Sequence, residues 1–175
     1  ATLRATGMAQ PAIAAATAAA IAVVRAIGLR PDAVAGHSFG ELSALHAAGA
    51  IDLAGLMHLA SVRGAAMEGV AAGGSMLALQ AHQDVIAKLL ESTPDIVVAN
   101  WNAPDQIVVA GPLAGIAALQ ERAQAIGIAA RALAVQGAFH SPAMIPAKIA
   151  FADALKGTAM SCPLVPVYAN ETAQI

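Results

Sequence analysis

Ser38 is the residue whose neighbours most clearly indicate chemistry. It is the centre of a Gly-His-Ser-Phe-Gly segment at positions 36–40, between a short apolar run at 33–35 and a stretch at 41–48 that is typical of a helix. A serine in such a tight strand-to-helix turn exposes its hydroxyl, and the turn requires both flanking positions to lack side chains. We therefore predict a nucleophile elbow in which Ser38 attacks a carbonyl carbon and the Phe39 N–H contributes to the oxyanion hole.

Arg63 and His140 are the downstream side chains best suited to assist this nucleophile. A planar guanidinium binds a carboxylate through two N–H groups, so Arg63 could hold an acidic substrate. Alternatively, Arg63 could be a solvated cation in the last turn of a helix that we predict from Leu53 to about Ala66, with Asp52 as its N-cap. His140 could be the general base, although a histidine taken alone is more often structural.

These segments resemble malonyl-CoA:acyl carrier protein transacylases, and specifically the acyltransferase domains of polyketide synthases. The resemblance runs from a segment that ends in Gln10-Pro11 to the segment at positions 167–170, so it covers almost the whole chain. Phe39 followed by Glu41-Leu42 is most similar to iterative synthases of the enediyne and polyunsaturated-fatty-acid types. The resemblance implies a hydrolase-like α/β subdomain with an inserted ferredoxin-like subdomain, and a site in the cleft between them.

The resemblance also implies a ping-pong acyl transfer. Ser38, deprotonated by His140, would take a malonyl group from malonyl-CoA and pass it to the phosphopantetheine thiol of an acyl carrier protein. Arg63 would hold the free carboxylate of the malonyl group. We expect no bound cofactor. The expected partners are the acyl carrier protein and neighbouring ketosynthase or other synthase domains.

Four further residues have less specific roles. His37 and Met67 would lie near the acyl group, but a structural role for the histidine and a core role for the methionine remain open. The resembled family orients its histidine with a main-chain carbonyl. Asp105 has the chain order of a serine–aspartate–histidine triad, but its place in a predicted hairpin turn favours a turn role. Gln10 is not the family's oxyanion glutamine, which belongs to a glycine–glutamine loop that has no counterpart here.

Phe139, just before His140, bears on substrate choice. Family members with Phe at this position resemble malonyl-selective domains, and those with Ser resemble methylmalonyl-selective ones. A phenyl ring beside the acyl α-carbon would collide with a branching methyl group, whereas a serine would leave space for it. Gly137 departs from the histidine that is commoner at its position in the family.

The middle of the chain follows a different pattern from its two ends. Strands are predicted at 75–79, 95–100, 106–110 and 128–135, and helices at 83–91 and 113–125. This β-α-β-β-α-β order is the ferredoxin-like pattern. Together with the resemblance, it predicts an α/β fold with a ferredoxin-like subdomain at 73–137 and a hydrolase-like subdomain at 1–72 and 138–175. We expect the chain to be a partial domain.

Composition argues against several other classes of protein. The 175 residues are 58% hydrophobic and 11% charged, with a net charge of -2 and no basic stripe, so we expect no nucleic-acid partner. The single cysteine, Cys162, cannot form an internal disulfide, and no metal-ligand spacing occurs, which indicates a reducing cytoplasm. The apolar run at 12–24, in a helix that we predict from Pro11 to Gly28, is shorter than the about 20 residues of a membrane span. We therefore expect a buried helix and no membrane partner.

Two other functions stay open from the sequence alone. One is a serine esterase or thioesterase of the α/β-hydrolase type, against which Arg63 and the ferredoxin-like pattern argue. The other is an acyltransferase-like docking domain without activity. Of the three, only the acyltransferase should hold a malonyl ester at Ser38 after exposure to malonyl-CoA.

Overall fold

The computed structural model describes residues 5–175. The chain divides into two compact units, one made of the residues up to Ala66 together with Ile149–Ile175, and the other of Met67–Lys148. The two divisions fall inside helices α3 (Leu53–Val70) and α6 (Ile145–Lys156). The middle segment at 73–137 lies within the second unit.

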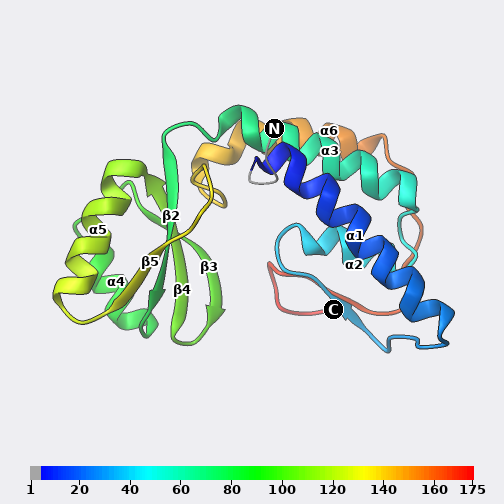
Figure 1. The fold of residues 1–175 in the computed structure, drawn as a ribbon, viewed down its shortest axis with the longest axis horizontal. Helices are drawn as coiled ribbons and strands as arrows, with labels where there is room; N and C mark the ends of the chain where they lie inside the picture. Colours follow the sequence, from blue (N-terminus) through cyan, green and yellow to red (C-terminus); the bar gives the residue numbers. More distant parts are fainter. Residues whose placement is uncertain (1–4) are drawn as a thin grey trace. The chain divides into compact units, whose positions relative to one another are not determined.

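The first unit combines helices with a short pair of parallel strands (Figure 1). Its elements are α1 (Thr6–Ala26), β1 (Val34–Ala35), α2 (Gly40–Ala47), most of α3, the later part of α6, and β6 (Val167–Tyr168). In the strand pair, Val34 lies opposite Val167 and Ala35 opposite Tyr168. An apolar cluster joins the helices and comprises Ala14, Ala18, Phe39, Leu42, Ile51, Leu56, Leu59 and Ala60. This cluster anchors α2, the helix that follows Ser38.

Helix α1 differs from the sequence prediction in three respects. It begins at Thr6, so Pro11 lies inside it and does not open it. With 21 residues it is long and apolar enough to cross a membrane by length and composition, so the argument from a short run is wrong. The helix is also not buried as a whole. Its buried residues in this structure are Gln10, Ala14 and Ala18.

The first turn of α1 lies close to α3. Gly64 approaches this turn so closely that a Cβ there would lie 2.8 Å from the Thr6 carbonyl oxygen. The buried residues of α1 recur every fourth position, which places them on one helix face. The helix begins before Pro11, although a proline normally marks the beginning of a helix.

The second unit contains a four-stranded antiparallel sheet. Its elements are β2 (Gly74–Gln80), α4 (Gln83–Leu90), β3 (Val97–Ala103), β4 (Gln106–Pro112), α5 (Leu113–Ala125), β5 (Ala129–Ala132) and a short 3-10 helix, Pro142–Met144. The strand order in the sheet is β3-β4-β2-β5. Leu77 of β2 lies opposite Val109 on one side and Ala132 on the other. The β-α-β-β-α-β order of elements predicted from the sequence is therefore present.

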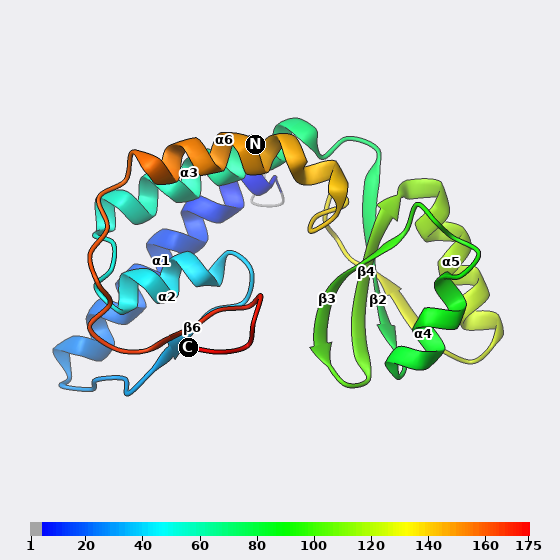
Figure 2. The same ribbon diagram turned by 180° about the vertical axis from the view of Figure 1, so that it is seen from behind.

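The two faces of this sheet bury different residues. On one face, Leu77, Leu79, Ile107 and Val109 pack with apolar residues of α4 and α5, and both helices cover this face (Figure 2). The alternate residues Met76, Val108 and Ala110 point to the other face, as strand geometry requires, and pack with Ala138. The segment that leads to His140 therefore belongs to the core of the second unit.

Candidate active site

Ser38 has the strained backbone expected of a nucleophile elbow. Its φ angle of 54° lies in the left-handed region, which residues with a Cβ seldom adopt. At Gly36 an added Cβ would overlap the Gly40 carbonyl group, so the turn requires glycine there. The prediction that both flanking positions must lack a side chain is wrong for Gly40. A Cβ at Gly40 would meet open space, because this residue already begins α2.

Phe39 anchors the turn through its side chain. The ring is 8% exposed and belongs to the apolar cluster of the first unit. Phe39 immediately precedes α2, and within residues 5–175 no hydrogen bond engages its N–H. A helix N-terminus favours negative charge, and an unpaired N–H there can donate to a developing oxyanion.

Arg63 lies in the interior of α3 and not in its last turn, so its interpretation as a helix-end cation is wrong. The helix continues to Val70, past the predicted end at about Ala66. The Nη1 of Arg63 donates to Gln10 Oε1 at 2.8 Å, and Nη2 donates to Ser38 Oγ at 3.4 Å. The predicted N-cap of this helix is confirmed, since Asp52 Oδ1 accepts the Gly55 N–H at 2.7 Å.

The electrostatic environment of Arg63 is mixed. Burial lowers the pKa of Arg63, and the nearby negative charge of Glu41 opposes this shift. An arginine keeps its charge near neutral pH despite such a shift. A partly desolvated cation therefore faces the hydroxyl of Ser38.

Gln10 is a site residue whose role the sequence analysis missed. It is 4% exposed, and its Nε2 donates to Thr6 Oγ1 at 2.9 Å while its Oε1 accepts from Arg63. The two contacts orient the amide and so fix one side of the Arg63 guanidinium. The sequence contained one signal of this role. Gln10, Ala14 and Ala18 recur every fourth position and so share one helix face, and Gln10 is the polar residue among them.

Asn170 is a second residue that the sequence analysis missed. Its Oδ1 accepts the Ser38 N–H at 2.8 Å, its Nδ2 donates to the Gly36 carbonyl at 2.7 Å, and its backbone N–H donates to Glu41 Oε1 at 2.8 Å. These partners lie 129 to 134 positions away in the chain. The sequence analysis used this segment only to mark the extent of the resemblance.

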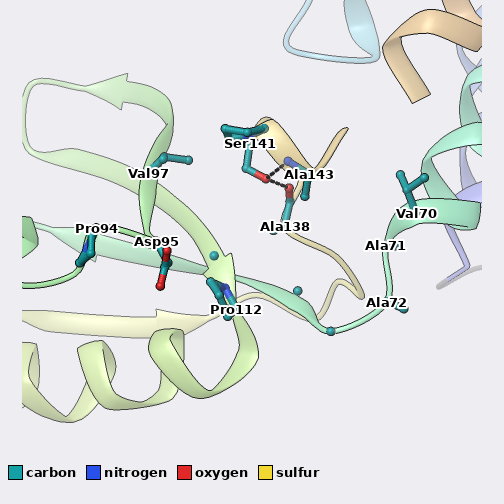
Figure 3. A pocket seen from close by; sticks show the side chains of 14 residues that line it. Val70, Ala71, Ala72, Pro94, Asp95, Val97, Pro112, Ala138, Ser141 and Ala143 are labelled. Carbon is teal, nitrogen blue, oxygen red and sulfur yellow. Dashed lines mark hydrogen bonds between the residues drawn. The ribbon is translucent and has the colours of Figure 1, made fainter. Parts of the chain in front are cut away.

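His140 lies in the second unit and has the same kind of backbone strain as Ser38. Its φ angle is 58°, and its side chain is exposed. Ser141 holds the segment: its Oγ donates to the Ala138 carbonyl at 2.6 Å and accepts the Ala143 N–H at 3.3 Å (Figure 3). A pocket of about 450 Å³ within this unit borders the segment, and Asp95 lies on its wall.

Phe139 and Gly137 form a close pair beside His140. A Cβ at Gly137 would lie 2.9 Å from the Phe139 ring and 2.8 Å from the Cβ of Ala71. Gly137 also has a φ angle of 141°, which a side chain disfavours. This crowding explains why glycine stands at a position where we expected histidine to be commoner. Phe139 is half-buried against the second face of the sheet.

The other predicted residues are less closely tied to the site. Met67 is buried, which is compatible with a core role, and His37 is exposed. Asp105 accepts a hydrogen bond from Gln80 Nε2 at 2.9 Å, next to the turn that joins β3 and β4. This contact supports the turn role of Asp105. Among residues 5–175, no group of three or more His, Cys, Asp or Glu side chains could hold a metal ion.

Comparison with known proteins decides the family. The model of the acyl transferase domain family matches residues 1–174. The chain belongs to this family. The family predicted from the elbow, Arg63 and His140 is therefore confirmed.

Several relatives of this acyl transferase chain are polyketide synthases or malonyltransferases. Mycoketide-CoA synthase of Mycobacterium tuberculosis is 39% identical over 173 residues, which are 99% of this chain and 4% of that protein. The crystal structure of the acyltransferase domain of an iterative polyketide synthase in enediyne biosynthesis is 40% identical, with a TM-score of 0.87 over 94% of this chain and 44% of that chain. The acyl-carrier-protein-S-malonyltransferase of Bartonella henselae is 36% identical, with a TM-score of 0.90 over 98% of this chain and 58% of that chain.

The acyl transferase chain thus spans about half the length of these two solved structures, and a small part of the synthase. Its fold is the α/β fold of acyltransferase domains, in part. Acyltransferases of this family act in polyketide and fatty-acid biosynthesis.

Proposed function

We propose that this chain carries the catalytic residues of an acyltransferase that moves a malonyl group from coenzyme A to the phosphopantetheine thiol of an acyl carrier protein. The observation that carries the proposal is the pairing of a strained serine with a partly buried arginine, whose Nη2 lies 3.4 Å from Ser38 Oγ. Membership of the acyl transferase family and the name of the Bartonella henselae malonyltransferase support it. We also propose that the synthase is of the iterative enediyne or polyunsaturated-fatty-acid type.

In the first half-reaction, Ser38 Oγ attacks the thioester carbonyl carbon of malonyl-CoA, and His140 accepts the hydroxyl proton. The tetrahedral oxyanion accepts a hydrogen bond from the Phe39 N–H. When the carbon–sulfur bond breaks, the proton passes from His140 to the coenzyme A thiolate. In the second half-reaction, the carrier thiol gives its proton to His140 and attacks the ester carbonyl carbon. The bond from this carbon to Ser38 Oγ then breaks, and the proton passes from His140 to Ser38 Oγ.

Arg63 selects a diacid in this mechanism. The guanidinium has lost part of its hydration through burial, so a carboxylate that reaches it replaces water and forms charge-assisted hydrogen bonds. An acetyl group has no carboxylate to offer. Gln10 Oε1 accepts a hydrogen bond from Arg63 Nη1 at 2.8 Å. This contact leaves Arg63 Nη2 turned towards Ser38 Oγ, the atom to which the acyl group becomes attached.

The order of the elements along the chain supports two subdomains, although the compact units divide at Met67 and Ile149, so that residues 67–72 and 138–148 lie in the second unit. We propose that residues 73–137 form the ferredoxin-like subdomain and that 1–72 and 138–175 belong to the hydrolase-like subdomain. The sheet order β3-β4-β2-β5 supports the first assignment. The parallel pairing of β1 and β6 next to the elbow supports the second.

The decisive experiment is mass spectrometry of the intact protein after brief exposure to malonyl-CoA, followed by addition of a carrier protein that bears phosphopantetheine. We expect a malonyl ester on the peptide that contains Ser38, and its transfer to the carrier thiol. Ser38→Ala should abolish the ester and keep the fold, because the substitution removes only the hydroxyl group. A malonyl label of equal size in Ser38→Ala would refute the proposal. Rapid release of free malonate without transfer would indicate an esterase, and absence of any ester would indicate a docking domain.

A further inference from the structure

The side chain of Asn170 continues the hydrogen-bonding pattern of the β1–β6 strand pair. The two strands pair in parallel through Ala35 opposite Tyr168, and both end there. Asn170 follows two residues later, and its amide donates to the Gly36 carbonyl at 2.7 Å and accepts the Ser38 N–H at 2.8 Å. A carboxamide side chain carries the same donor and acceptor as a peptide group. The amide therefore bonds the two peptide groups that flank His37, as a residue of a paired strand would.

This arrangement fixes the backbone on the N-terminal side of Ser38. The turn leaves the strand at Gly36 and reaches a φ angle of 54° at Ser38. Such left-handed conformations persist where surrounding contacts determine them. Asn170 supplies two of these contacts from a segment that lies 132 to 134 positions away in the sequence.

A third contact extends the restraint to the helix after the turn. The backbone N–H of Asn170 donates to Glu41 Oε1 at 2.8 Å, and Glu41 lies in the first turn of α2. A carboxylate is favoured at this end of a helix by the helix dipole. Asn170 thus links the strand end before Ser38 to the helix start after it. Asn170 occupies the Ser38 N–H, whereas no hydrogen bond among residues 5–175 engages the Phe39 N–H.

We propose that Asn170 is a positioning residue for acyl transfer: it holds Ser38 in the conformation from which the hydroxyl attacks, without contacting the substrate itself. The inference rests on the proposed function, because it concerns the reactivity of Ser38. It predicts that loss of the Asn170 amide lowers the rate at which Ser38 reacts with any electrophile, and leaves binding of malonyl-CoA unchanged, since Arg63 is untouched.

The test compares Asn170→Ala and Asn170→Asp with wild type, with Glu171→Ala as a matched control on the neighbouring exposed residue. Two rates are measured on the intact protein: malonylation by malonyl-CoA over a range of concentrations, and labelling of Ser38 by a fluorophosphonate. We expect Asn170→Ala to lower both maximal rates by about 10- to 100-fold, because a small misplacement of a reacting group has an effect of this size. The malonyl-CoA concentration that gives half of the maximal rate should not change. Glu171→Ala should match wild type.

Asn170→Asp keeps the acceptor for the Ser38 N–H but places a carboxylate oxygen against the Gly36 carbonyl oxygen, which repels it, so its rates should also fall below those of wild type. If Asn170→Ala does not fold, the two rates of Asn170→Asp test whether Asn170 positions Ser38. Fluorophosphonate labelling within threefold of wild type in a folded Asn170 variant would overturn the inference, as would an equal loss in Glu171→Ala. If wild type reacts with fluorophosphonate but not with malonyl-CoA, the proposed function fails while the labelling rates still test the role of Asn170.

Discussion

The two strained residues of the proposed dyad, Ser38 and His140, are held by different means. Both have φ angles between 50° and 60°, and they are two of the three non-glycine residues within 5–175 with a positive φ. Ser38 is fixed by distant parts of the first unit, through the buried Phe39 ring and the hydrogen bonds of Asn170. His140 is exposed, while its neighbours Ala138 and Phe139 pack against the sheet of the second unit and Ser141 bridges the segment with short-range hydrogen bonds.

This difference shows which part of the mechanism tolerates change. The nucleophile must sit at one place relative to the Phe39 N–H and to Arg63, so its geometry is built into the packing of the unit. A general base moves a proton over a hydrogen-bond distance, and the side chain of His140 is exposed, unlike those of its neighbours Ala138 and Phe139. We therefore expect substitutions in the elbow to affect both fold and reaction, and substitution of His140 itself to affect mainly the reaction.

The largest expected effect is that of Gly36→Ala. The new Cβ would overlap the Gly40 carbonyl, so the elbow must open, with a cost of about 1–3 kcal/mol or more in the free energy of unfolding. Malonylation of Ser38 should be lost. Gly40→Ala is the matched control, because its Cβ meets open space and alanine is favoured over glycine in a helix by roughly 0.5–1 kcal/mol. Chemical denaturation measures the free energy of unfolding of both variants. Equal values for the two would contradict the steric account of the elbow.

His140→Ala should leave the unfolding free energy nearly unchanged, because the side chain is exposed. Malonylation should slow by roughly 10²–10⁴-fold, the usual contribution of a general base. Single-turnover kinetics with malonyl-CoA measures this loss. A change of less than about tenfold would return His140 to a structural role. Ser141→Ala offers a graded comparison, since it loosens the segment and leaves the imidazole in place.

Arg63→Ala should distinguish malonyl from acetyl transfer. Charge-assisted hydrogen bonds contribute about 1.5–3 kcal/mol, so malonylation should fall by roughly 10- to 150-fold, while any acetylation from acetyl-CoA should change much less. Arg63→Lys should rescue in part, since a point charge does not reproduce the planar fork. The ratio of the two acylation rates is the measurement. Equal losses for the two thioesters would show that Arg63 supports the fold of the site and does not bind the carboxylate.

Arg63 also shows why some of the structure followed from the sequence and some did not. The strand and helix order of the second unit was readable, because β2 and β4 are short runs of mostly apolar residues that are buried consecutively, and glycines or prolines mark the turns. The bounds of α1 and α3 were not, since α1 begins before Pro11 and α3 continues past Ala66 to Val70. A proline is a local signal for the beginning of a helix, but Pro11 lies inside α1.

The same limit applies to the site. Ser38, Phe39 and Arg63 could be predicted, the first two from the short local pattern of the elbow and Arg63 from the resemblance to the family. Gln10 and Asn170 act through hydrogen bonds to residues that are 53 and more than 120 positions away, so no local pattern reveals them. The polar spacing of Gln10 in an apolar helix was the only trace of its role.

The smallest expected effect concerns substrate choice at Phe139, the residue before His140. The ring lies over Gly137, where a Cβ would come within 2.9 Å of it, so it is confined on one side. If the ring borders the acyl α-carbon, wild type should prefer malonyl-CoA over methylmalonyl-CoA by roughly 10- to 200-fold, the discrimination that one methyl group allows. Phe139→Ser should reduce this preference by about tenfold, because it opens space for the branching methyl group.

A competition between the two thioesters, with the acyl-enzyme products separated by mass, measures the preference directly. Phe139→Leu is the matched control, since it keeps an apolar side chain against the second face of the sheet and should retain more of the preference than serine does. Equal acylation of wild type by both thioesters, or an unchanged ratio in Phe139→Ser, would refute the steric account. If the ratio of malonyl to methylmalonyl acylation changes equally in the leucine and serine variants, the preference depends on how the His140 segment packs and not on the volume of the Phe139 ring. Substrate choice would then follow from the position of His140 relative to the sheet of the second unit.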